Sequence, residues 1–225
     1  MIGEHAQLSL QAFERLAPEL IASFAGASTC QVVDALGGDG ALDARIKPLV
    51  LGSPAAVGSA LTVECHPGDM FGVLAAMPHV RPGDVLVVAS GGAQQIALTG
   101  DLVALALKSK GAAGFVTDGY VRDIAGLRDC GLPVFAAGLV PRSATKTGPG
   151  KIGGVIVCGG AAICSGDLIV ADEDGVVVVP RARIQDVLNN LPSIVAAEQQ
   201  AARAIAIDAG FFDNFAAAGR GRSEG

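Results

Sequence analysis

The sequence predicts an α/β protein in which helices pack on a mixed β-sheet. Helical and strand patterns alternate through the first half of the chain, and two strand patterns joined by a tight turn follow in the second half. The turn is Asp172-Glu173-Asp174-Gly175, a strong hairpin signal. With 225 residues, of which 51% are hydrophobic, the chain is long enough to bury one large core.

Two helices are predicted near the N-terminus. The first has helical spacing from Leu10 to Phe24, and Pro18 is expected to bend or divide it. Ser28 or Thr29 can cap the second helix, which a Gly-Gly pair ends after Leu36.

The middle of the chain has three clear patterns. Ala60–Cys65 alternates as a strand, and the residues PGDM begin a helix over Phe71–Met77. Asp84–Ala89 is a continuous apolar run, which predicts a strand buried on both faces. Further elements are predicted in order: strands near 113–117, 133–137, 154–158, 167–171 and 176–179, then an alanine-rich helix from Arg181 to about Asp208.

The pattern predicts one domain over residues 1–225. No linker rich in proline or serine and no run of charge divides the chain. Within this domain we expect N-terminal helices at about 9–36, a core at about 55–180 and a C-terminal helical segment at about 181–215.

Composition narrows the function. A net charge of −6 and the absence of tryptophan argue against nucleic acid as a ligand. The N-terminus lacks the basic start of a signal peptide, and no apolar run approaches the length that spans a membrane. The five cysteines have no short paired spacing. We therefore expect buried thiols in a reducing cytoplasm rather than a zinc site.

Two other patterns carry weak signals. His66 and His79 have no recognisable nucleophile beside them, and no GxSxG motif is present, so a nucleophilic mechanism is disfavoured. GPGKIGG at 148–154 is similar to a phosphate-binding loop. It lacks the Gly-Lys-Ser/Thr ending and the helix that must follow, so we expect an ordinary loop there.

The most informative segment is GDLVALALKSKGAAGFVTDGYVRD, which begins at Gly100. Asp101 opens a predicted helix, Leu102 to about Lys110, and twenty residues separate Asp101 from the pair Arg122-Asp123. A helix N-terminus offers free N–H groups to anions, here those of Leu102 and Val103. Arginine binds carboxylates through two parallel hydrogen bonds, and aspartates are hard ligands for Mg²⁺ or Mn²⁺. If these groups converge, they can hold and polarise a small 2-oxo acid.

Each of these residues also has a structural interpretation. Arg122 could form a surface salt bridge with Asp118 or Asp129. Asp123 could cap the helix that follows it, predicted over 124–129, and Asp101 could be a first-turn acid that stabilises the helix dipole.

Several motifs together resemble the RraA-like family. They are the Asp-x20-Arg-Asp pattern, STCQVVDALGGDGAL (28–42), PGD (67–69), RPGDVLVVASGG (81–92) and SGDLIVADEDGVVVVP (165–180). The similarity covers roughly residues 25–200. It implies a swivelling-domain-like α-β-β-α sandwich that assembles as homotrimers or homohexamers. The family includes class II pyruvate aldolases that act on 4-hydroxy-4-methyl-2-oxoglutarate and 4-carboxy-4-hydroxy-2-oxoadipate.

The resemblance implies a divalent-metal-dependent lyase that releases pyruvate and also decarboxylates oxaloacetate. Asp123 would ligate Mg²⁺ or Mn²⁺ directly and Asp101 would act through water. Gly100, Arg122 and the N–H groups at the start of the helix, from Leu102 and Val103, would bind the pyruvyl portion. Glu198, on the C-terminal helix, would supply an acid across a subunit contact. The alternative function is a non-catalytic RraA-type protein, which inhibits a ribonuclease by protein contact.

Two positions depart from many relatives. Met70 stands where many carry asparagine after PGD, and Ala125 and Gly126 stand where many carry acidic residues after Arg-Asp. We expect these departures to affect the choice of substrate and to leave the metal-assisted chemistry intact.

Overall fold

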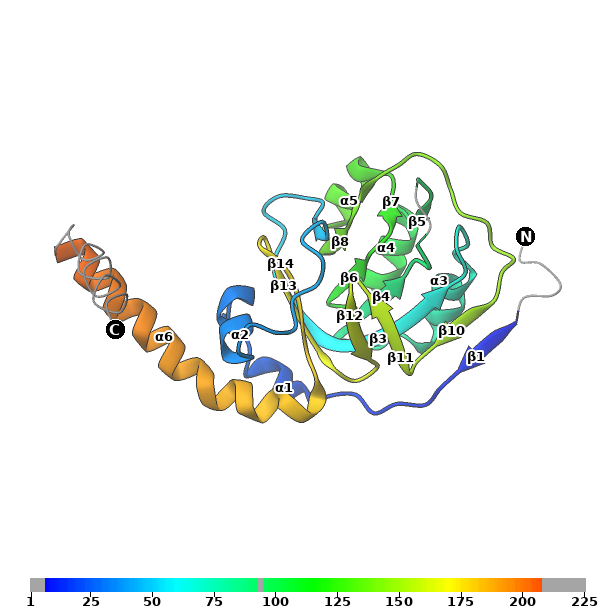
Figure 1. Cartoon of the computed structure of the whole chain (residues 1–225). Coiled ribbons are helices and arrows are strands. Elements are labelled where there is room, and N and C mark those ends of the chain that lie inside the picture. Colours follow the sequence, from blue (N-terminus) through cyan, green and yellow to red (C-terminus); the bar gives the residue numbers. More distant parts are fainter. Residues whose placement is uncertain (1–6, 93–94, 208–225) are drawn as a thin grey trace, which may run out of the picture.

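The computed structural model describes residues 7–92 and 95–207. In this part of the chain the centre is a mixed nine-stranded sheet (Figure 1). Four neighbouring strands are parallel: β3 (Ala56–Cys65), β4 (Asp84–Ala89), β6 (Gly114–Thr117) and β8 (Val134–Ala136). The sheet is completed by β1 (Leu8–Leu10), β2 (Lys47–Pro48), β10 (Gly150–Ile152) and the hairpin β13 (Leu168–Asp172)–β14 (Gly175–Val179).

Two smaller sheets flank this centre. One is parallel and consists of β5 (Ala97–Thr99), β7 (Tyr120–Val121) and β9 (Gly138–Leu139). The other is an antiparallel pair, β11 (Val155–Cys158) and β12 (Ala161–Cys164). The helices are α1 (Pro18–Ala22), α2 (Thr29–Ala35), α3 (Phe71–Ala76), α4 (Asp101–Ser109), α5 (Ile124–Cys130) and α6 (Ile184–Ile207), with 3-10 turns η1 (Met77–His79) and η2 (Arg181–Arg183).

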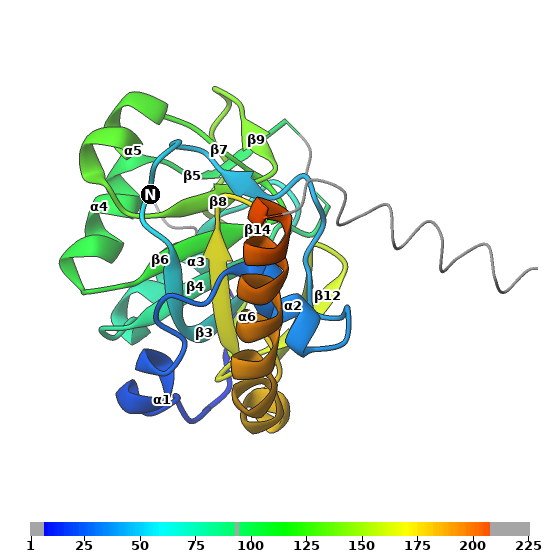
Figure 2. The same ribbon diagram turned by 90° about the vertical axis from the view of Figure 1, so that its left-hand side faces the viewer.

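The layers follow from the apolar faces of the strands. In β4, Leu86 and Val88 pack toward α3, α4 and α5, whereas Val85 and Val87 face the β13–β14 hairpin and the β11–β12 pair. The opposite face of the hairpin packs on α2 and α6. Figure 2 shows this order from left to right: α4 and α5, then β6 and β8, then β14 with α6 and α2. The predicted α/β class, mixed sheet and α-β-β-α layering are confirmed.

Some predicted elements are confirmed in detail. Ser28 caps α2, and it forms a capping box with Gln31 in which each side chain bonds the other's backbone N–H. The run Asp84–Ala89 is a strand with every residue buried. The hairpin at 172–175 is present. The C-terminal helix is present as far as Ile207, and the rest of the segment expected to about 215 lies outside the described residues.

Three expectations were wrong. The helix predicted over Leu10–Phe24 is restricted to Pro18–Ala22, because proline occupies the first turn of α1, where its missing N–H costs nothing. The GPGKIGG segment is not wholly a loop, since it contains β10, which pairs with β1 and β3. Finally, Cys30 and Cys164 are exposed, although the other three cysteines are buried as expected.

No helix in the described ranges is both long enough and apolar enough to span a membrane.

Candidate functional site

Two short parallel strands bring the predicted site residues together. β5 ends at Thr99 and β7 ends at Val121, and these two residues are partners in the small sheet. The backbone N–H of Arg122 donates to the carbonyl oxygen of Thr99 at 3.1 Å. Residues that follow neighbouring parallel strands emerge at one edge of a sheet, the usual ligand-binding edge of α/β proteins. The start of α4 and the Arg122-Asp123 pair therefore lie side by side.

These residues line a cavity of about 330 Å³. All six residues predicted for the site around α4 contribute to it: Gly100, Asp101, Leu102, Val103, Arg122 and Asp123. The remaining lining residues are Met70, Leu74, Met77, Ala97, Thr99, Ala106, Ser143 and Lys146. One end of the cavity, at the start of α4 and just after β7, thus has both acidic and basic side chains. The part beside α3 and η1 is largely apolar.

Gly100 is required by the close approach of Asp123. An added Cβ at Gly100 would collide with the Oδ2 atom of Asp123 and lie 3.2 Å from Cγ of Arg122. Glycine at the N-cap of α4 therefore allows the backbone and this carboxylate to come together.

Arg122 pairs with its neighbour in the chain. Its Nε lies 3.1 Å from Oδ2 of Asp123, and both side chains are about 40% exposed, at 41% and 40%. No ion pair joins Arg122 to Asp118 or Asp129 in the described part of the chain. An exposed pair of this kind contributes at most about 1 kcal/mol, so the guanidinium is available to a ligand.

Asp123 has a strained backbone. Its φ is 63° and its ψ is 47°, in the left-handed region that non-glycine residues seldom adopt. It occupies the N-cap position of α5, yet its side chain makes no capping hydrogen bond. The capping interpretation is therefore not realised, and the carboxylate faces the cavity with Arg122 as its partner.

The N–H of Leu102 is not free, contrary to expectation. Oδ1 of Asp101 accepts a hydrogen bond from it at 2.7 Å. The first backbone bond of α4 runs from Ala104 N to Gly100 O at 3.1 Å, so the N–H of Val103 precedes the intrahelical ladder. An anion at this helix end would bond Val103 directly and would compete with Asp101 for Leu102.

The other side of the Asp101 carboxylate contacts α5. An added Cβ at Gly126 would collide with Oδ2 of Asp101 and lie 2.8 Å from its Cγ. The absence of a side chain at Gly126 thus makes the room in which Asp101 sits.

The sequence did not point to three polar lining residues: Thr99, Ser143 and Lys146. Met70 was noticed as a departure after PGD, but nothing in the sequence placed Ser143 or Lys146 near Arg122. Thr99 is 3% exposed, and its Oγ1 is a buried side-chain atom without a hydrogen-bond partner in the described residues. A buried unsatisfied hydroxyl costs about 1–3 kcal/mol, so its presence at a cavity marks a place for a ligand or water.

Glu198 lies elsewhere in the chain. It is exposed on α6, where its Oε2 accepts a hydrogen bond from Nε2 of Gln31 at 2.7 Å. Helix α6 packs on α2, and Glu198 does not line the cavity of the same chain.

The donor set suits a hard divalent cation held partly by solvent. Asp101 and Asp123 supply carboxylate oxygens at one end of the cavity. Among the described residues, no group of three or more His, Cys, Asp and Glu side chains is arranged to hold a metal. Mg²⁺ is often bound by one or two carboxylates, with water and substrate completing its coordination. The residues present therefore fit Mg²⁺ or Mn²⁺ and do not form a closed structural site.

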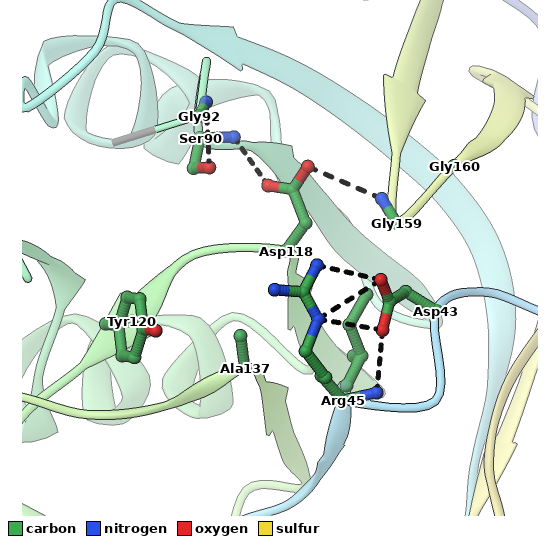
Figure 3. Close-up of a pocket in the computed structure, with 10 residues that line it drawn as sticks. Asp43, Arg45, Ser90, Gly92, Asp118, Tyr120, Ala137, Gly159 and Gly160 are labelled. Carbon is green, nitrogen blue, oxygen red and sulfur yellow. Dashed lines mark hydrogen bonds and ion pairs between the residues drawn. The ribbon is translucent and has the colours of Figure 1, made fainter. Parts of the chain in front are cut away.

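A second polar cavity, of about 220 Å³, lies at the ends of β4, β6 and β8 (Figure 3). Its charged side chains already form hydrogen bonds within the chain. Arg45 forms a fork with Asp43 at 2.8–3.2 Å, which lowers the pKa of Asp43 to about 2. Asp118 accepts from the N–H of Ser90 at 2.8 Å. These groups stabilise loops, and the cavity near Arg122 is the stronger candidate.

A family model and a similar protein indicate the family of this chain. Residues 29–178 match the family model described as RraA-like, Aldolase/RraA. A provisionally named 4-hydroxy-4-methyl-2-oxoglutarate aldolase of Halalkalibacterium halodurans is 40% identical over 187 residues, which cover 83% of this chain and 89% of that protein.

Solved structures show the same fold. Streptomyces coelicolor RraAS2, described as an unusual member of the RNase ES inhibitor RraA family, aligns with a TM-score of 0.73 and 31% identity, over 84% of this chain and 96% of that one. The RNA-processing inhibitor RraA of Thermus thermophilis aligns with a TM-score of 0.63 and 28% identity, over 68% and 93% of the two chains.

Proposed function

This chain belongs to the RraA-like family, and from that premise we propose that it is a divalent-metal-dependent lyase. Its substrate would be 4-hydroxy-4-methyl-2-oxoglutarate or a related 4-hydroxy-2-oxo acid, and its product pyruvate. The observation that carries this proposal is the convergence of Arg122, the start of α4 and two carboxylates in one cavity. The name of the 40% identical relative supports the aldolase activity.

The chain's own groups bind the 2-oxo acid end of the substrate. Arg122 offers two parallel N–H groups to its carboxylate, and Val103 offers a backbone N–H at the positive end of α4. Gly100 lets the Asp123 carboxylate lie against the backbone at this end of the cavity. The apolar side chains of Leu74 and Met77 exclude water from the carbon chain.

Asp123 would hold Mg²⁺ or Mn²⁺ directly, and Asp101 would hold it through water. The cation supplies electrostatic stabilisation of negative charge on the oxygens of the substrate. Without it, Asp101 and Asp123 would repel a substrate carboxylate docked at the same helix end.

Cleavage requires loss of a proton from the 4-hydroxyl group. The Asp101 carboxylate takes this proton through a water that it holds. The bond between C3 and C4 breaks, the C4 oxygen becomes the keto group of the second product, and the electron pair of the broken bond moves toward the 2-oxo group. Arg122 stabilises the negative charge that develops there, and the same proton returns through water to C3 to give pyruvate. Oxaloacetate loses CO₂ with the same movement of charge, so decarboxylation is expected from the same residues.

We expect the protein to act as a homotrimer or homohexamer. Helix α6 extends from the body of the molecule (Figure 1), and Ile205 and Ile207 near its end are exposed. In such an assembly Glu198 would reach the cavity of a neighbouring copy and supply an acid there. Leu102 and Leu105, exposed on α4 beside the cavity, provide an apolar surface for that contact.

Metal removal tests the proposed activity. Purified full-length protein is treated with EDTA, and pyruvate release from 4-hydroxy-4-methyl-2-oxoglutarate and oxaloacetate is measured before and after Mg²⁺ or Mn²⁺ is restored. We expect pyruvate release by the wild-type protein to stop after EDTA treatment and to recover when the metal is restored. With the metal restored, Asp123→Asn should release pyruvate at less than about 1% of the wild-type rate, the scale of losing one group that stabilises the transition state. Full activity in metal-free buffer would contradict the metal assignment.

The alternative function is inhibition of a ribonuclease by protein contact, as the descriptions of the two RraA structures suggest. It requires neither Arg122 nor a metal. Absence of pyruvate release, together with metal-independent inhibition of an RNA-degrading endonuclease, would favour this alternative.

A further inference from the structure

One buried hydroxyl group in the candidate cavity has no hydrogen-bond partner. Oγ1 of Thr99 is the one buried side-chain nitrogen or oxygen atom in the described part of the chain that lacks a partner. Other buried threonines there are satisfied: Oγ1 of Thr62 donates to a backbone carbonyl at 2.9 Å, and Oγ1 of Thr29 donates to Asp172 at 2.6 Å. A hydroxyl that is buried without a partner destabilises a protein. Thr99 is therefore unfavourable for the fold, and the benefit of keeping it must be sought in the cavity.

Strand β5 directs this side chain toward the cavity. Side chains alternate across a strand, so Ala97 and Thr99 share one face of β5 and Leu98 takes the other. Ala97 and Thr99 line the cavity, whereas Leu98 packs in the hydrophobic core. The hydroxyl of Thr99 lies in the cavity wall, and rotation about its χ1 torsion can bring it to the surface of that wall.

The backbone of β5 is held on both sides. The N–H of Arg122 donates to the carbonyl oxygen of Thr99 at 3.1 Å. On the other side, the N–H of Ala97 donates to Arg142 O at 2.7 Å, and the N–H of Ala144 donates to Ala97 O at 3.2 Å. A strand fixed in this way keeps the Thr99 side chain at the cavity instead of moving it toward a partner within the chain.

A neighbouring wall of the cavity is fixed by one buried carboxylate. Oδ2 of Asp69 accepts hydrogen bonds from Oγ1 of Thr145 at 2.6 Å, N of Thr147 at 2.7 Å and N of Gly148 at 2.9 Å, and Oδ1 accepts from N of Phe71 at 2.7 Å. Burial acts to raise the pKa of Asp69, but these hydrogen bonds outweigh burial and hold the pKa below its usual 3.8. The ionised carboxylate thus attaches the loop after β9 to α3, and the cavity keeps its shape.

Thr99 adjoins the charged end of the cavity. It directly precedes Gly100 and Asp101, and its carbonyl is bonded to Arg122. Under the proposed function the carboxylate and the 2-oxo group bind at that end, and the C4 carbon with its oxygen extends beyond them. This oxygen is neutral both as a hydroxyl group and as the keto group of the product, and a neutral hydroxyl donor suits it in both states.

We propose that Oγ1 of Thr99 donates a hydrogen bond to the 4-oxygen of the substrate, and that the site thereby selects 4-hydroxy-2-oxo acids over acids that lack this hydroxyl group. This inference rests on the proposed function, which places the 2-oxo acid end at Arg122. The proton of the 4-hydroxyl leaves toward the water held by Asp101, and Thr99 keeps its own proton throughout. An acid without the 4-oxygen leaves the Thr99 hydroxyl unpaired, which disfavours its binding.

Thr99→Val tests this role, because valine has the shape of threonine but no hydroxyl group. The substrate is 4-hydroxy-4-methyl-2-oxoglutarate with Mg²⁺ present, and the competitive inhibitor is 4-methyl-2-oxoglutarate, which lacks only the 4-hydroxyl group and cannot be cleaved. We expect kcat/KM for pyruvate release to fall by about 5- to 150-fold, the range for leaving one polar group unpaired, and the inhibition constant to stay within about twofold of wild type. Thr99→Ser keeps the hydroxyl and should retain kcat/KM within about threefold.

Unfolding in urea gives a readout that does not depend on activity. Thr99→Val should raise the urea midpoint by about 0.3–1 M, because it removes a buried group that has no partner. Thr62→Val is the matched control. It removes a buried hydroxyl that is hydrogen-bonded, so it should lower the midpoint and leave kcat/KM and the inhibition constant near their wild-type values.

Several outcomes would overturn the inference even if the wild-type protein releases pyruvate. They are a Thr99→Val variant with wild-type kcat/KM, one that loses kcat/KM and inhibitor affinity equally, one with a lower urea midpoint, and a Thr99→Ser variant as impaired as the valine variant.

A wild-type protein that releases no pyruvate contradicts the lyase and leaves the inference testable. Neither acid is then consumed, and calorimetry with Mg²⁺ gives both dissociation constants. A preference for the hydroxylated acid that Thr99→Val abolishes supports the inference, whereas equal affinities for the two acids in the wild-type protein overturn it.

Discussion

Two glycines make room for the two carboxylates of the candidate site. Gly100 leaves the space that Asp123 occupies, and Gly126 leaves the space that Asp101 occupies. In each case the missing side chain belongs to one of the two helices and the carboxylate to the start of the other. The site therefore needs glycine at these two positions as much as it needs the two charged residues.

Gly126→Ala tests this requirement. Alanine usually stabilises a helix interior by about 0.5–1 kcal/mol relative to glycine, so α5 considered alone should gain stability. We expect the variant to show no such gain and to lose at least about tenfold in pyruvate release, because its Cβ displaces Asp101. Urea unfolding and steady-state kinetics measure the two effects.

Ala125→Gly is the matched control for that variant. Residue 125 is exposed on the same helix, so this change should cost stability and leave pyruvate release near the wild-type rate. A Gly126→Ala variant that is more stable and fully active would show that Asp101 does not need its present position.

At the scale of elements, the loop at 143–148 depends on Asp69 for its attachment to α3. Because the folded-state pKa of Asp69 is depressed, its contribution to stability is present above the unfolded value near 3.8 and is lost as pH falls through the folded value. Asp69→Asn replaces an acceptor by a donor facing backbone N–H groups. We expect it to lower the free energy of unfolding by about 2–4 kcal/mol at pH 6–7.

The difference between wild type and Asp69→Asn should shrink as the pH is lowered below about 4, and urea unfolding at several pH values measures it. Asp129→Asn, at an exposed position on α5, is the control and should follow the wild-type curve. A difference independent of pH would contradict the role of the ionised carboxylate.

Elements with their own local signals were predictable from the sequence. The capping box of α2 and the apolar run of β4 are determined by residues within those segments. β5 and β7 could not be predicted, because strands of three and two residues have no periodicity and depend on pairing with each other, with β9 and, for β5, with Ser143. The same holds for β10, which packs closely on α3. A Cβ added at Gly150 would lie only 2.7 Å from the Cα atom of Gly72.

The same distinction explains the site. Asp101, Arg122 and Asp123 were predictable as a group, because charged residues next to the start of a helix suggest a binding site for anions or metal ions. Lys146 was not, because its place in the cavity is determined by bonds between Asp69 and a loop more than seventy residues away in the chain. The state of the Leu102 N–H was also missed, since it depends on the rotamer of Asp101.

At the scale of the whole molecule, the α-β-β-α layers bury the parallel strands and leave their carboxyl ends at the surface, where both cavities lie. The net charge of −6 opposes the approach of an anionic substrate. Attraction must therefore be local, and under the proposed function it would come from Arg122, Lys146 and the start of α4 in this cavity, together with the proposed cation.

The central claim is that Arg122 binds and stabilises the reacting 2-oxo acid, and Arg122→Lys tests it most directly. Lysine keeps the charge but cannot form two parallel hydrogen bonds to a planar group. The measurement is kcat/KM for pyruvate release from 4-hydroxy-4-methyl-2-oxoglutarate with saturating Mg²⁺, with Arg128→Lys on α5 as the control. We predict a loss of about 2–4 kcal/mol in transition-state stabilisation, roughly 30- to 1,000-fold, and an unchanged control. An Arg122→Lys variant that retains about half of the wild-type value would contradict the account and make Arg122 a structural partner of Asp123.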